Sequence, residues 1–260
     1  GIVEGITEFL PVSSTGHLLV VGELIGFGTG SSSTAADTYS IAIQFGAILA
    51  VLLLYRIRVW SAMKGLVGAD ADGRAFLIRL IVAFLPAAFL GVLAGDAMKS
   101  ALFGPVPVTI AWVVGGVFLL RWKPTVGSVS LHEMPIRAAL IIGCAQSIAL
   151  WPGVSRSLVT LVAALAVGLS MSAAIEFSFL LGLITLSSAT ALDLTKHGSE
   201  LVDQFGILAP AIGLVCAFIT AVIAVKWMVG YLESHSLRVF GWYRLAIGAV
   251  SVVLLATNVL

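Results

Sequence analysis

Residues 4–17 read EGITEFLPVSSTGH, and this stretch decides the fold. Glu4 and Glu8 are four positions apart, so both carboxylates lie on one face of a helix. Pro11 ends that helix, because proline has no N–H and moves the residue before it out of the helical region. The sequence therefore predicts a broken helix that carries two acids toward its break.

Polar side chains follow Pro11 directly. Ser13, Ser14 and Thr15 are candidate N-caps of a second helix, which continues into the apolar run LLVV from residue 18. His17 lies one helical turn after Ser14. Two acids, three hydroxyls and an imidazole are thus expected around one helix break, and we interpret this group as a functional site.

The composition places this site in a membrane protein. Of the 260 residues, 60% are hydrophobic and only 10% are charged, whereas a soluble domain carries roughly a quarter charged residues. The apolar segments are too long for a β-barrel, whose strands alternate over about ten residues. The net charge of +1 gives no indication of nucleic acid binding, and we expect none.

Six apolar segments are long enough to cross a hydrocarbon core of about 30 Å. They are residues 39–55, 76–95, 106–120, 171–192, 206–229 and 239–259. Residues 136–150 and 158–168 are shorter and are separated by Pro152-Gly153. Because neither short piece can cross alone, we predict a re-entrant hairpin there, and another at the opening stretch.

The chain has two similar halves, each a hairpin followed by three spans. Ser13 corresponds to Ser155, and counting back nine residues from each matches Glu4 with Gln146. Because three is odd, the second half enters the membrane upside down. The predicted fold is an all-α membrane protein with six transmembrane helices plus two re-entrant broken-helix hairpins, arranged as an inverted-topology repeat. Residues 1–125 and 126–260 form its two repeats within one integrated membrane domain.

The basic residues predict the orientation. Threading six spans places eleven Lys and Arg residues on one side and only Lys99 and Lys196 on the other. The eleven are Arg56, Arg58, Lys64, Arg74, Arg79, Arg121, Lys123, Arg137, Lys226, Arg238 and Arg244. By the positive-inside rule their side is cytoplasmic, so the opening hairpin and both termini are expected on the outer face.

A second polar cluster surrounds the second predicted break, in the sequence WPGVSRSLVT at residues 151–160. The planar guanidinium of Arg156 suits two phosphate oxygens at once, although an internal ion pair with an acid of the first cluster is an alternative that can coexist. Ser155, Ser157 and Thr160 are expected in the first turn of a half-helix, either as caps or as ligands of an anion. We expect the two clusters to converge, with Arg156 within about 8 Å of Ser14 or of the two acids.

Three further interpretations concern two residue pairs and one single residue. The spacing of Ser14 and His17 favours a nucleophile and its base. Glu4 and Glu8 would repel each other, so a divalent cation or a bound arginine is expected between them. Glu176 faces either the site or a packing partner, and the sequence does not decide which.

Four segments together resemble one known family: EGITEFLPVSSTGH, IQFGAILAV, WPGVSRSLVT and EFSFLL. The chain is similar over nearly its whole length to undecaprenyl-pyrophosphate phosphatases of the bacitracin-resistance type. The resemblance implies a multi-pass enzyme of the bacterial plasma (inner) membrane, with its site open to the outer face. Such an enzyme removes the terminal phosphate of the C55 prenyl pyrophosphate and so recycles the lipid carrier of cell-wall synthesis. It also implies a divalent cation, Mg²⁺ or Ca²⁺.

By motif position, the resemblance implies that Glu4, Glu8, Ser14, His17 and Arg156 are essential and that Ser13, Ser155 and Thr160 support them. Combined with the residue analysis, this gives three candidate groups. The catalytic candidates are Ser14, His17, Glu8 and Arg156. The metal candidates are Glu4 and Glu8. The substrate-binding candidates are Ser13, Thr15, Ser155, Ser157, Thr160 and Gln146. The chain departs from the family pattern at Leu158-Val159, where small residues are common, and at residues 182–185, where a proline is usual.

Two functions stay open at this stage. In the first, Ser14 attacks the terminal phosphoryl group with His17 as base, or a metal-activated water takes the place of Ser14. In the second, the same inverted repeat is a transporter or flippase that binds a phosphate-bearing lipid or anion without cleaving it. The expected partners are the polyprenyl pyrophosphate and the lipid bilayer, and the sequence is compatible with a homodimer.

Overall fold

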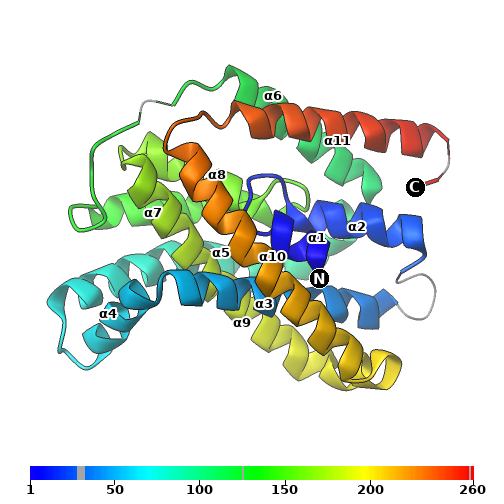
Figure 1. Ribbon diagram of the computed structural model, residues 1–260, viewed down its shortest axis with the longest axis horizontal. Coiled ribbons are helices and arrows are strands. Elements are labelled where there is room, and N and C mark those ends of the chain that lie inside the picture. Colours follow the sequence, from blue (N-terminus) through cyan, green and yellow to red (C-terminus); the bar gives the residue numbers. More distant parts are fainter. Residues whose placement is uncertain (28–32, 125, 258) are drawn as a thin grey trace.

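The structure is a computed structural model that describes residues 1–27, 33–124, 126–257 and 259–260, without the side chains of Ser33, Asp96 and Lys99. Figure 1 shows an assembly of helices, most of them joined by short connections. The helices are α1 (Ile2–Thr7), α2 (Ser14–Ile25), α3 (Ser33–Leu54), α4 (Arg56–Leu66), α5 (Ala71–Leu102), α6 (Pro105–Arg121), α7 (Ile136–Gln146), the 3₁₀ turn η2 (Ser147–Leu150), α8 (Arg156–Ala166), α9 (Met171–Phe205), α10 (Leu208–Leu232) and α11 (Arg238–Ala256).

The predicted class, an all-α membrane protein, is confirmed. Within the described residues, five helices are long and apolar enough to cross a membrane: Thr34–Leu54, Ala71–Gly95, Met171–Phe205, Leu208–Leu232 and Arg238–Ala256. The remaining predicted segment, residues 106–120, forms α6, which is apolar but has only 17 residues. Large apolar side chains such as Phe89 and Ile223 are exposed on these helices, as expected where lipid replaces water.

Two breaks interrupt the helical chain. The first break, residues 8–13, separates α1 from α2, and the second break, residues 151–155, separates η2 from α8. Each ends at a serine that caps the next helix: Ser13 Oγ accepts the Gly16 N–H, and Ser155 Oγ accepts the Leu158 N–H. Both breaks contain the predicted proline, Pro11 or Pro152, although α1 already ends at Thr7, four residues before Pro11.

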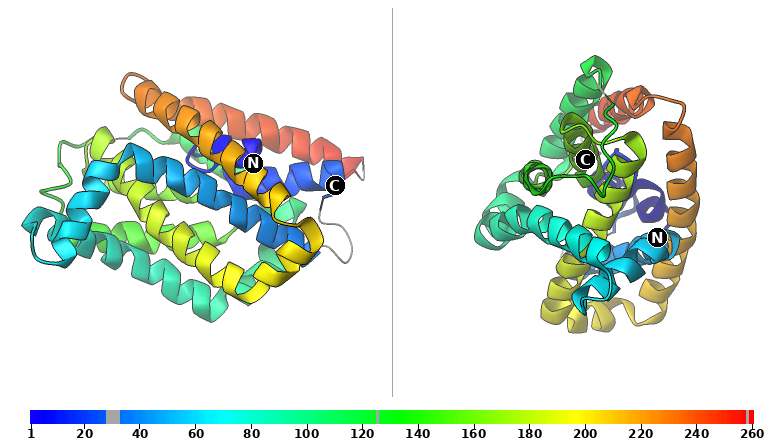
Figure 2. Two further views of the ribbon diagram at one scale, coloured as in Figure 1. Left: turned by 60° about the horizontal axis from the view of Figure 1, so that its bottom comes forward. Right: turned by 90° about the vertical axis from the view of Figure 1, so that its left-hand side faces the viewer.

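The helices of the two halves pack in matched pairs. Helix α1 packs on α10 as α7 packs on α5, while α3 packs on α9 and α6 on α11. The right view of Figure 2 shows the start of the chain, in dark blue, lying between the longer helices. Helix α1 approaches α10 closely because Gly5 has no side chain, since a Cβ there would overlap Thr220 and the Ala217 carbonyl. The polar first break is thereby held inside an otherwise apolar bundle.

Several predicted boundaries are wrong. The basic residues between the first two predicted spans predict a loop there, but residues 56–66 form the helix α4, in which Arg56, Arg58 and Lys64 alternate with exposed apolar residues such as Trp60. Helix α5 continues to Leu102 and α9 to Phe205, well beyond the apolar segments that ended at residues 95 and 192. Charged residues can have helix propensities as high as those of apolar residues. A fall in hydropathy therefore did not end these helices. The Gly, Ser and Thr residues of positions 26–34 predict a loop there; this segment lies partly outside the described residues, and α3 already begins at Ser33.

Candidate active site

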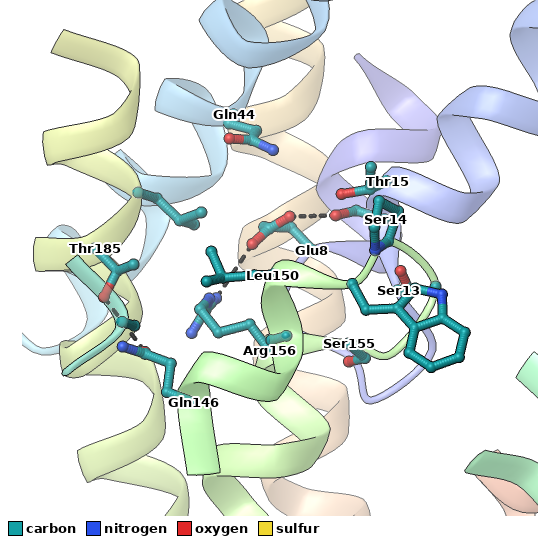
Figure 3. Close-up of a pocket in the computed structure, with 16 residues that line it drawn as sticks. Glu8, Ser13, Ser14, Thr15, Gln44, Gln146, Leu150, Ser155, Arg156 and Thr185 are labelled. Atoms are coloured by element: carbon teal, nitrogen blue, oxygen red, sulfur yellow. Dashed lines mark hydrogen bonds and ion pairs between the residues drawn. The ribbon is translucent and has the colours of Figure 1, made fainter. Parts of the chain in front are cut away.

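The two breaks face each other across a cavity of about 160 Å³, shown in Figure 3. The first break and the start of α2 contribute Glu8, Ser13, Ser14 and Thr15. The second break and its flanks contribute residues 149–153, together with Gln146, Ser155 and Arg156. Helices α3, α5 and α9 complete the lining with Gln44, Ala87, Thr185 and Leu186. Polar groups from both halves of the chain therefore line one cavity.

Glu8 connects the two breaks. Its Oε2 atom accepts a hydrogen bond from the Ser14 hydroxyl, and its Oε1 atom lies 3.1 Å from Nη2 of Arg156. All three side chains are buried or nearly so. The expected convergence of the two clusters is therefore confirmed, through an ion pair between residues 148 positions apart. A carboxylate that accepts a serine proton on one side and contacts a guanidinium on the other is arranged for nucleophilic attack on an anion.

The Arg156 guanidinium is held from two sides, and its Nε has no hydrogen-bond partner among the described residues. Nη1 donates to the Ser178 carbonyl at 3.2 Å, and the guanidinium carbon lies 5.5 Å from the ring centre of Phe9. The Nε atom is buried. An unpaired buried donor is costly, so we expect this N–H to gain a partner when a ligand binds beside Arg156.

Gly182 on α9 provides the space that Arg156 occupies. A Cβ at this position would overlap the guanidinium. The overlap involves the far end of a flexible side chain and no backbone, so an alanine here would displace Arg156 without disrupting the helix packing. Residues 182–185 are also where the chain lacks the usual family proline, and the structure places the guanidinium of Arg156 against that segment.

We expect Gly182→Ala to fold normally and to lower turnover roughly tenfold or more, because a displacement of about 1 Å at a reacting group is costly in rate. The matched control is Gly198→Ala on the same helix, where a Cβ meets open space. Melting temperature and phosphate release from a prenyl diphosphate would be measured for both variants. Equal turnover of the two variants would show that Arg156 tolerates displacement.

The other hydroxyls of α8 form hydrogen bonds that hold the helices together. Ser157 Oγ donates to the Leu10 carbonyl at 2.9 Å, and Thr160 Oγ1 lies 2.5 Å from the Ser178 hydroxyl. Their role in substrate binding stays a prediction, and both residues are buried and do not line the cavity. The reason is their side of the helix: they face the first break and α9. Ser155, by contrast, lines the cavity.

The predicted contact between Ser14 and His17 is absent from the hydrogen bonds of the described residues. His17 Nδ1 lies 2.6 Å from the Ser13 carbonyl, and Nε2 lies 2.8 Å from the Tyr243 hydroxyl. The ring packs against Trp112 and stacks on Tyr243. His17 is therefore turned toward α6 and α11, away from the cavity, and the base closest to Ser14 is Glu8.

Gln146 lines the far side of the cavity, as Figure 3 shows. Its side chain is only 2% exposed, and its Oε1 accepts from Thr185 at 3.3 Å. Its Nε2 has no partner within the described part of the chain. The amide therefore offers donors to a ligand in the cavity, and Thr15 adds a hydroxyl to the same lining.

Glu4 is the candidate metal ligand that the structure leaves without a partner. It is fully buried, and neither carboxylate oxygen forms a hydrogen bond among the described residues. Such a carboxylate fits a hard cation such as Mg²⁺ or Ca²⁺, which prefers oxygen ligands. The described residues contain no group of three His, Cys, Asp or Glu side chains placed so that they could hold a metal ion, and both oxygens of Glu8 are already engaged. A cation here would therefore share Glu8 with Ser14 and Arg156 and take further oxygens from the substrate.

Arg244 is placed differently from the sequence expectation. It was counted among the cytoplasmic surface charges, but it is fully buried within α11 and contacts backbone carbonyls of both breaks. Its position only six residues from Arg238 made it resemble a loop charge, and no local pattern distinguishes the two. The sequence also left Glu176 undecided, and this residue pairs with Arg58 at 2.7 Å outside the cavity.

The fold and site define an all-α membrane protein with acidic, hydroxyl and guanidinium groups gathered between two helix breaks. The chain belongs to the family described as bacitracin resistance protein BacA, which matches residues 1–250. A relative from Sorangium cellulosum, named undecaprenyl-diphosphatase, is 44% identical over 257 residues, covering 96% of this chain and 82% of the relative. Relatives of the same name from Rhodopseudomonas palustris and Acinetobacter baumannii are 42% and 40% identical. These two alignments cover 98% and 96% of this chain, and 95% and 91% of the relatives.

Proposed function

We propose that this protein hydrolyses undecaprenyl diphosphate to undecaprenyl phosphate and inorganic phosphate. The observation that carries the proposal is the contact of Ser14 and Arg156 with opposite oxygens of one buried carboxylate, Glu8. The names of the relatives supply the substrate. The transporter alternative is not favoured, because binding without cleavage does not require a hydroxyl paired with a base.

In the proposed first step, Ser14 Oγ attacks the terminal phosphorus and its proton passes to Glu8. The Ser14 Oγ–phosphorus bond forms as the bond between that phosphorus and the bridging oxygen breaks, so undecaprenyl phosphate departs. The free Nε–H of Arg156 and the unpaired N–H groups that begin α2 and α8 would hold the phosphoryl oxygens as their charge redistributes. The amide of Gln146 and the hydroxyls of Ser13, Thr15 and Ser155 would add further hydrogen bonds.

In the second step, water attacks the phosphoserine. Glu8, having given up its first proton to the departing group or to solvent, accepts a proton from this water, and Ser14 recovers one as inorganic phosphate leaves. A divalent cation at Glu4 and Glu8 would neutralise part of the charge of the diphosphate when bound. Ser157, Thr160 and Ser178 hold α8 in register with the first break and so keep Arg156 in place.

We further propose that the two broken segments are re-entrant hairpins and that six helices cross the membrane, α6 being the shortest. Six residues in α1 and twelve in α2 span only about 9 and 18 Å. The matched packing of α1 on α10 and of α7 on α5 supports the inverted repeat of residues 1–125 and 126–260. A homodimer stays a prediction from the sequence.

The proposed orientation in the bacterial plasma membrane keeps the basic side cytoplasmic. With Arg244 removed from the eleven basic residues, ten still stand against two. Helix α4, the connection from α6 to α7 and the turn between α10 and α11 lie at one end of the molecule, on the left in Figure 1 and in the left view of Figure 2. The hairpin of the first break and both termini would then belong to the outer side.

The direct test is phosphate release from undecaprenyl or farnesyl diphosphate by the purified protein in detergent. Release is measured with Mg²⁺, with Ca²⁺ and with EDTA, against Glu8→Gln as the control. The proposal expects release by the wild-type protein, almost none by the variant, and a loss with EDTA that either cation restores. No release with either cation would favour binding without hydrolysis. Full activity in EDTA would reject the proposed cation but not the proposed hydrolysis.

We expect His17→Asn to retain much more activity than Glu8→Gln. The structure engages both ring nitrogens of His17 outside the cavity, whereas Glu8 contacts the reacting hydroxyl. Loss of a general base costs roughly 10²- to 10⁴-fold in rate, and loss of a structural hydrogen bond costs mainly stability. The comparison uses kcat and melting temperature of both variants. If both variants lost kcat equally at equal stability, His17 would be the general base after all.

A further inference from the structure

The guanidinium of Arg244 contacts both helix breaks at once. Nη1 donates to the carbonyls of Pro11 at 3.4 Å and Val154 at 3.3 Å, and Nη2 donates to those of Ala111 at 2.8 Å and Gly153 at 2.9 Å. Arg244 is fully buried, and these four acceptors belong to three separate segments. A single side chain of α11 therefore links the first break, the second break and α6.

The contacts fall on corresponding atoms of the two breaks. Pro11 stands two residues before the cap Ser13, and Gly153 stands two residues before the cap Ser155. Ser13 and Ser155 also share an unusual backbone conformation, with φ and ψ of 71° and 101° in one and 76° and 110° in the other. They are the only non-glycine residues with positive φ in the described part of the chain. Arg244 thus bridges two segments of nearly the same geometry.

Both breaks need such a partner. A break in a helix leaves carbonyls without the usual helical N–H, and a buried carbonyl without a donor is costly. The planar fork of arginine can satisfy several carbonyls in a fixed arrangement, which the single ammonium of lysine cannot reproduce. The strained cap residues are maintained only where surrounding contacts hold them. Arg244 supplies such contacts to residues that lie just before both caps.

The separation of the breaks sets the geometry of the site. Ser14 directly follows Ser13, and Arg156 directly follows Ser155, so the hydroxyl and the guanidinium that would act on a phosphoryl group lie within three residues of the Arg244 contacts. A change in the distance between the breaks would move these two groups relative to each other. Their ion-pair and hydrogen-bond connection through Glu8 requires that distance to be short.

Helix α6 is adapted to this contact. Gly115 lies against the guanidinium, and a Cβ there would stand 2.8 Å from both Cζ and Nε of Arg244. Trp112 on the same helix donates from Nε1 to the Val12 carbonyl at 2.9 Å, which ties the first break to α6 a second time. The side chain of Arg244 therefore has a dedicated space, and Gly115→Ala offers a way to displace the guanidinium without removing its charge.

We propose that Arg244 is a positioning residue that fixes the separation of the two helix breaks and thereby the alignment of Ser14 with Arg156. Its effect on rate rests on the proposed diphosphatase function, but its effect on the distance between the breaks does not. It contacts no reacting atom and acts through the backbone of both segments.

The experiment compares Arg244→Met, Arg244→Lys and Gly115→Ala with two controls. Arg238→Met removes an exposed arginine from the same helix. Ser251→Ala removes a buried polar contact with Thr109 between the same two helices, α6 and α11, without touching either break. Each protein is assayed for kcat, KM and melting temperature. In a background with Cys144 and Cys216 replaced by alanine, nitroxide labels at the exposed positions Ile25 and Ile141 report the distance between the two hairpins by pulsed EPR.

We expect Arg244→Met to broaden the distance distribution and to lower kcat roughly a hundredfold with a smaller change in KM, because misalignment by about 1 Å has this order of effect. Arg244→Lys should recover part of both losses, and Gly115→Ala should reproduce them in part. Ser251→Ala should lower the melting temperature while keeping the kcat of the folded protein and the narrow distribution. Arg238→Met should change neither kcat nor the distribution.

An unchanged distance distribution in Arg244→Met would overturn the proposal, and so would a lowered melting temperature with an unchanged kcat. If Arg244→Met does not fold, Arg244→Lys and Gly115→Ala decide, and wild-type distributions in both would overturn it. A broadened distribution in a protein without any phosphatase activity would support the positioning role and reject the proposed function separately.

Discussion

Ser14→Ala is expected to fold, to insert into membranes and to bind the prenyl diphosphate, yet to hydrolyse it at least roughly a thousandfold more slowly, because loss of a nucleophile removes a chemical step. The Ser14 hydroxyl donates to a buried carboxylate inside the cavity, and the alanine leaves both Glu8 and Arg156 in place. Measurement of kcat together with binding of a non-hydrolysable diphosphate analogue would separate lost chemistry from lost binding.

The neighbouring hydroxyls are the controls for this variant. Ser13 caps α2 through the Gly16 N–H, and loss of a cap costs about 1 kcal/mol of stability. Thr15 lines the cavity without contacting Glu8 in the described hydrogen bonds. Ser13→Ala and Thr15→Ala should therefore lose far less kcat than Ser14→Ala. If Ser14→Ala kept a tenth or more of the wild-type kcat, a water molecule would be the attacking group.

Arg156→Lys should be nearly as damaging, although it keeps the charge. The guanidinium simultaneously contacts Glu8 and the Ser178 carbonyl and keeps a free Nε–H for a ligand. One ammonium group cannot make all these contacts in a plane, and loss of a single preorganised donor to a developing oxyanion costs roughly 10²- to 10³-fold in rate. We expect a loss of that size in kcat/KM, measured by phosphate release.

Arg58→Lys is the matched control, because Arg58 pairs with Glu176 outside the cavity. An exchange of arginine for lysine there should leave kcat/KM within about twofold of the wild-type value, because the pair is partly exposed and such pairs contribute little. Near-normal turnover of Arg156→Lys would mean that a point charge suffices at this position, and the free Nε–H would then have no role in binding.

Local chemistry made the helix breaks predictable. Pro11 and Pro152 stop helices by the same steric rule wherever they occur, and the serines that follow are strong caps. The correspondence of Ser13 with Ser155 also indicated that the two breaks belong to one site, which the ion pair of Arg156 with Glu8 confirms. These features depend on a few neighbouring residues and can be derived from sequence.

Tertiary partners could not be derived in the same way. The spacing of Ser14 and His17 suggested a catalytic pair, but His17 contacts Tyr243, which is 226 positions away. A helical spacing states which residues can share a face, and it does not state which neighbour each side chain finds. Helix α4 was missed for a related reason, because a helix of mixed charged and apolar residues and a charged loop have similar composition.

Arg244 and Gly182 show the same limit more sharply. A buried arginine that satisfies backbone carbonyls looks, in sequence, like any basic residue near the end of an apolar segment. The space for Arg156 depends on the absence of a side chain at Gly182, and one glycine among 27 carries no distinguishing pattern. Both roles come from contacts between segments that the chain order does not place together.

The stereochemical course at phosphorus tests the central claim, attack by Ser14, most directly. The purified protein would hydrolyse a prenyl diphosphate whose terminal thiophosphoryl group is made chiral with oxygen isotopes, in water that carries a third isotope. Attack by Ser14 followed by attack of water gives two in-line displacements, and the account predicts overall retention of configuration in the released thiophosphate. Inversion would reveal a single displacement by water and would contradict the proposed role of Ser14.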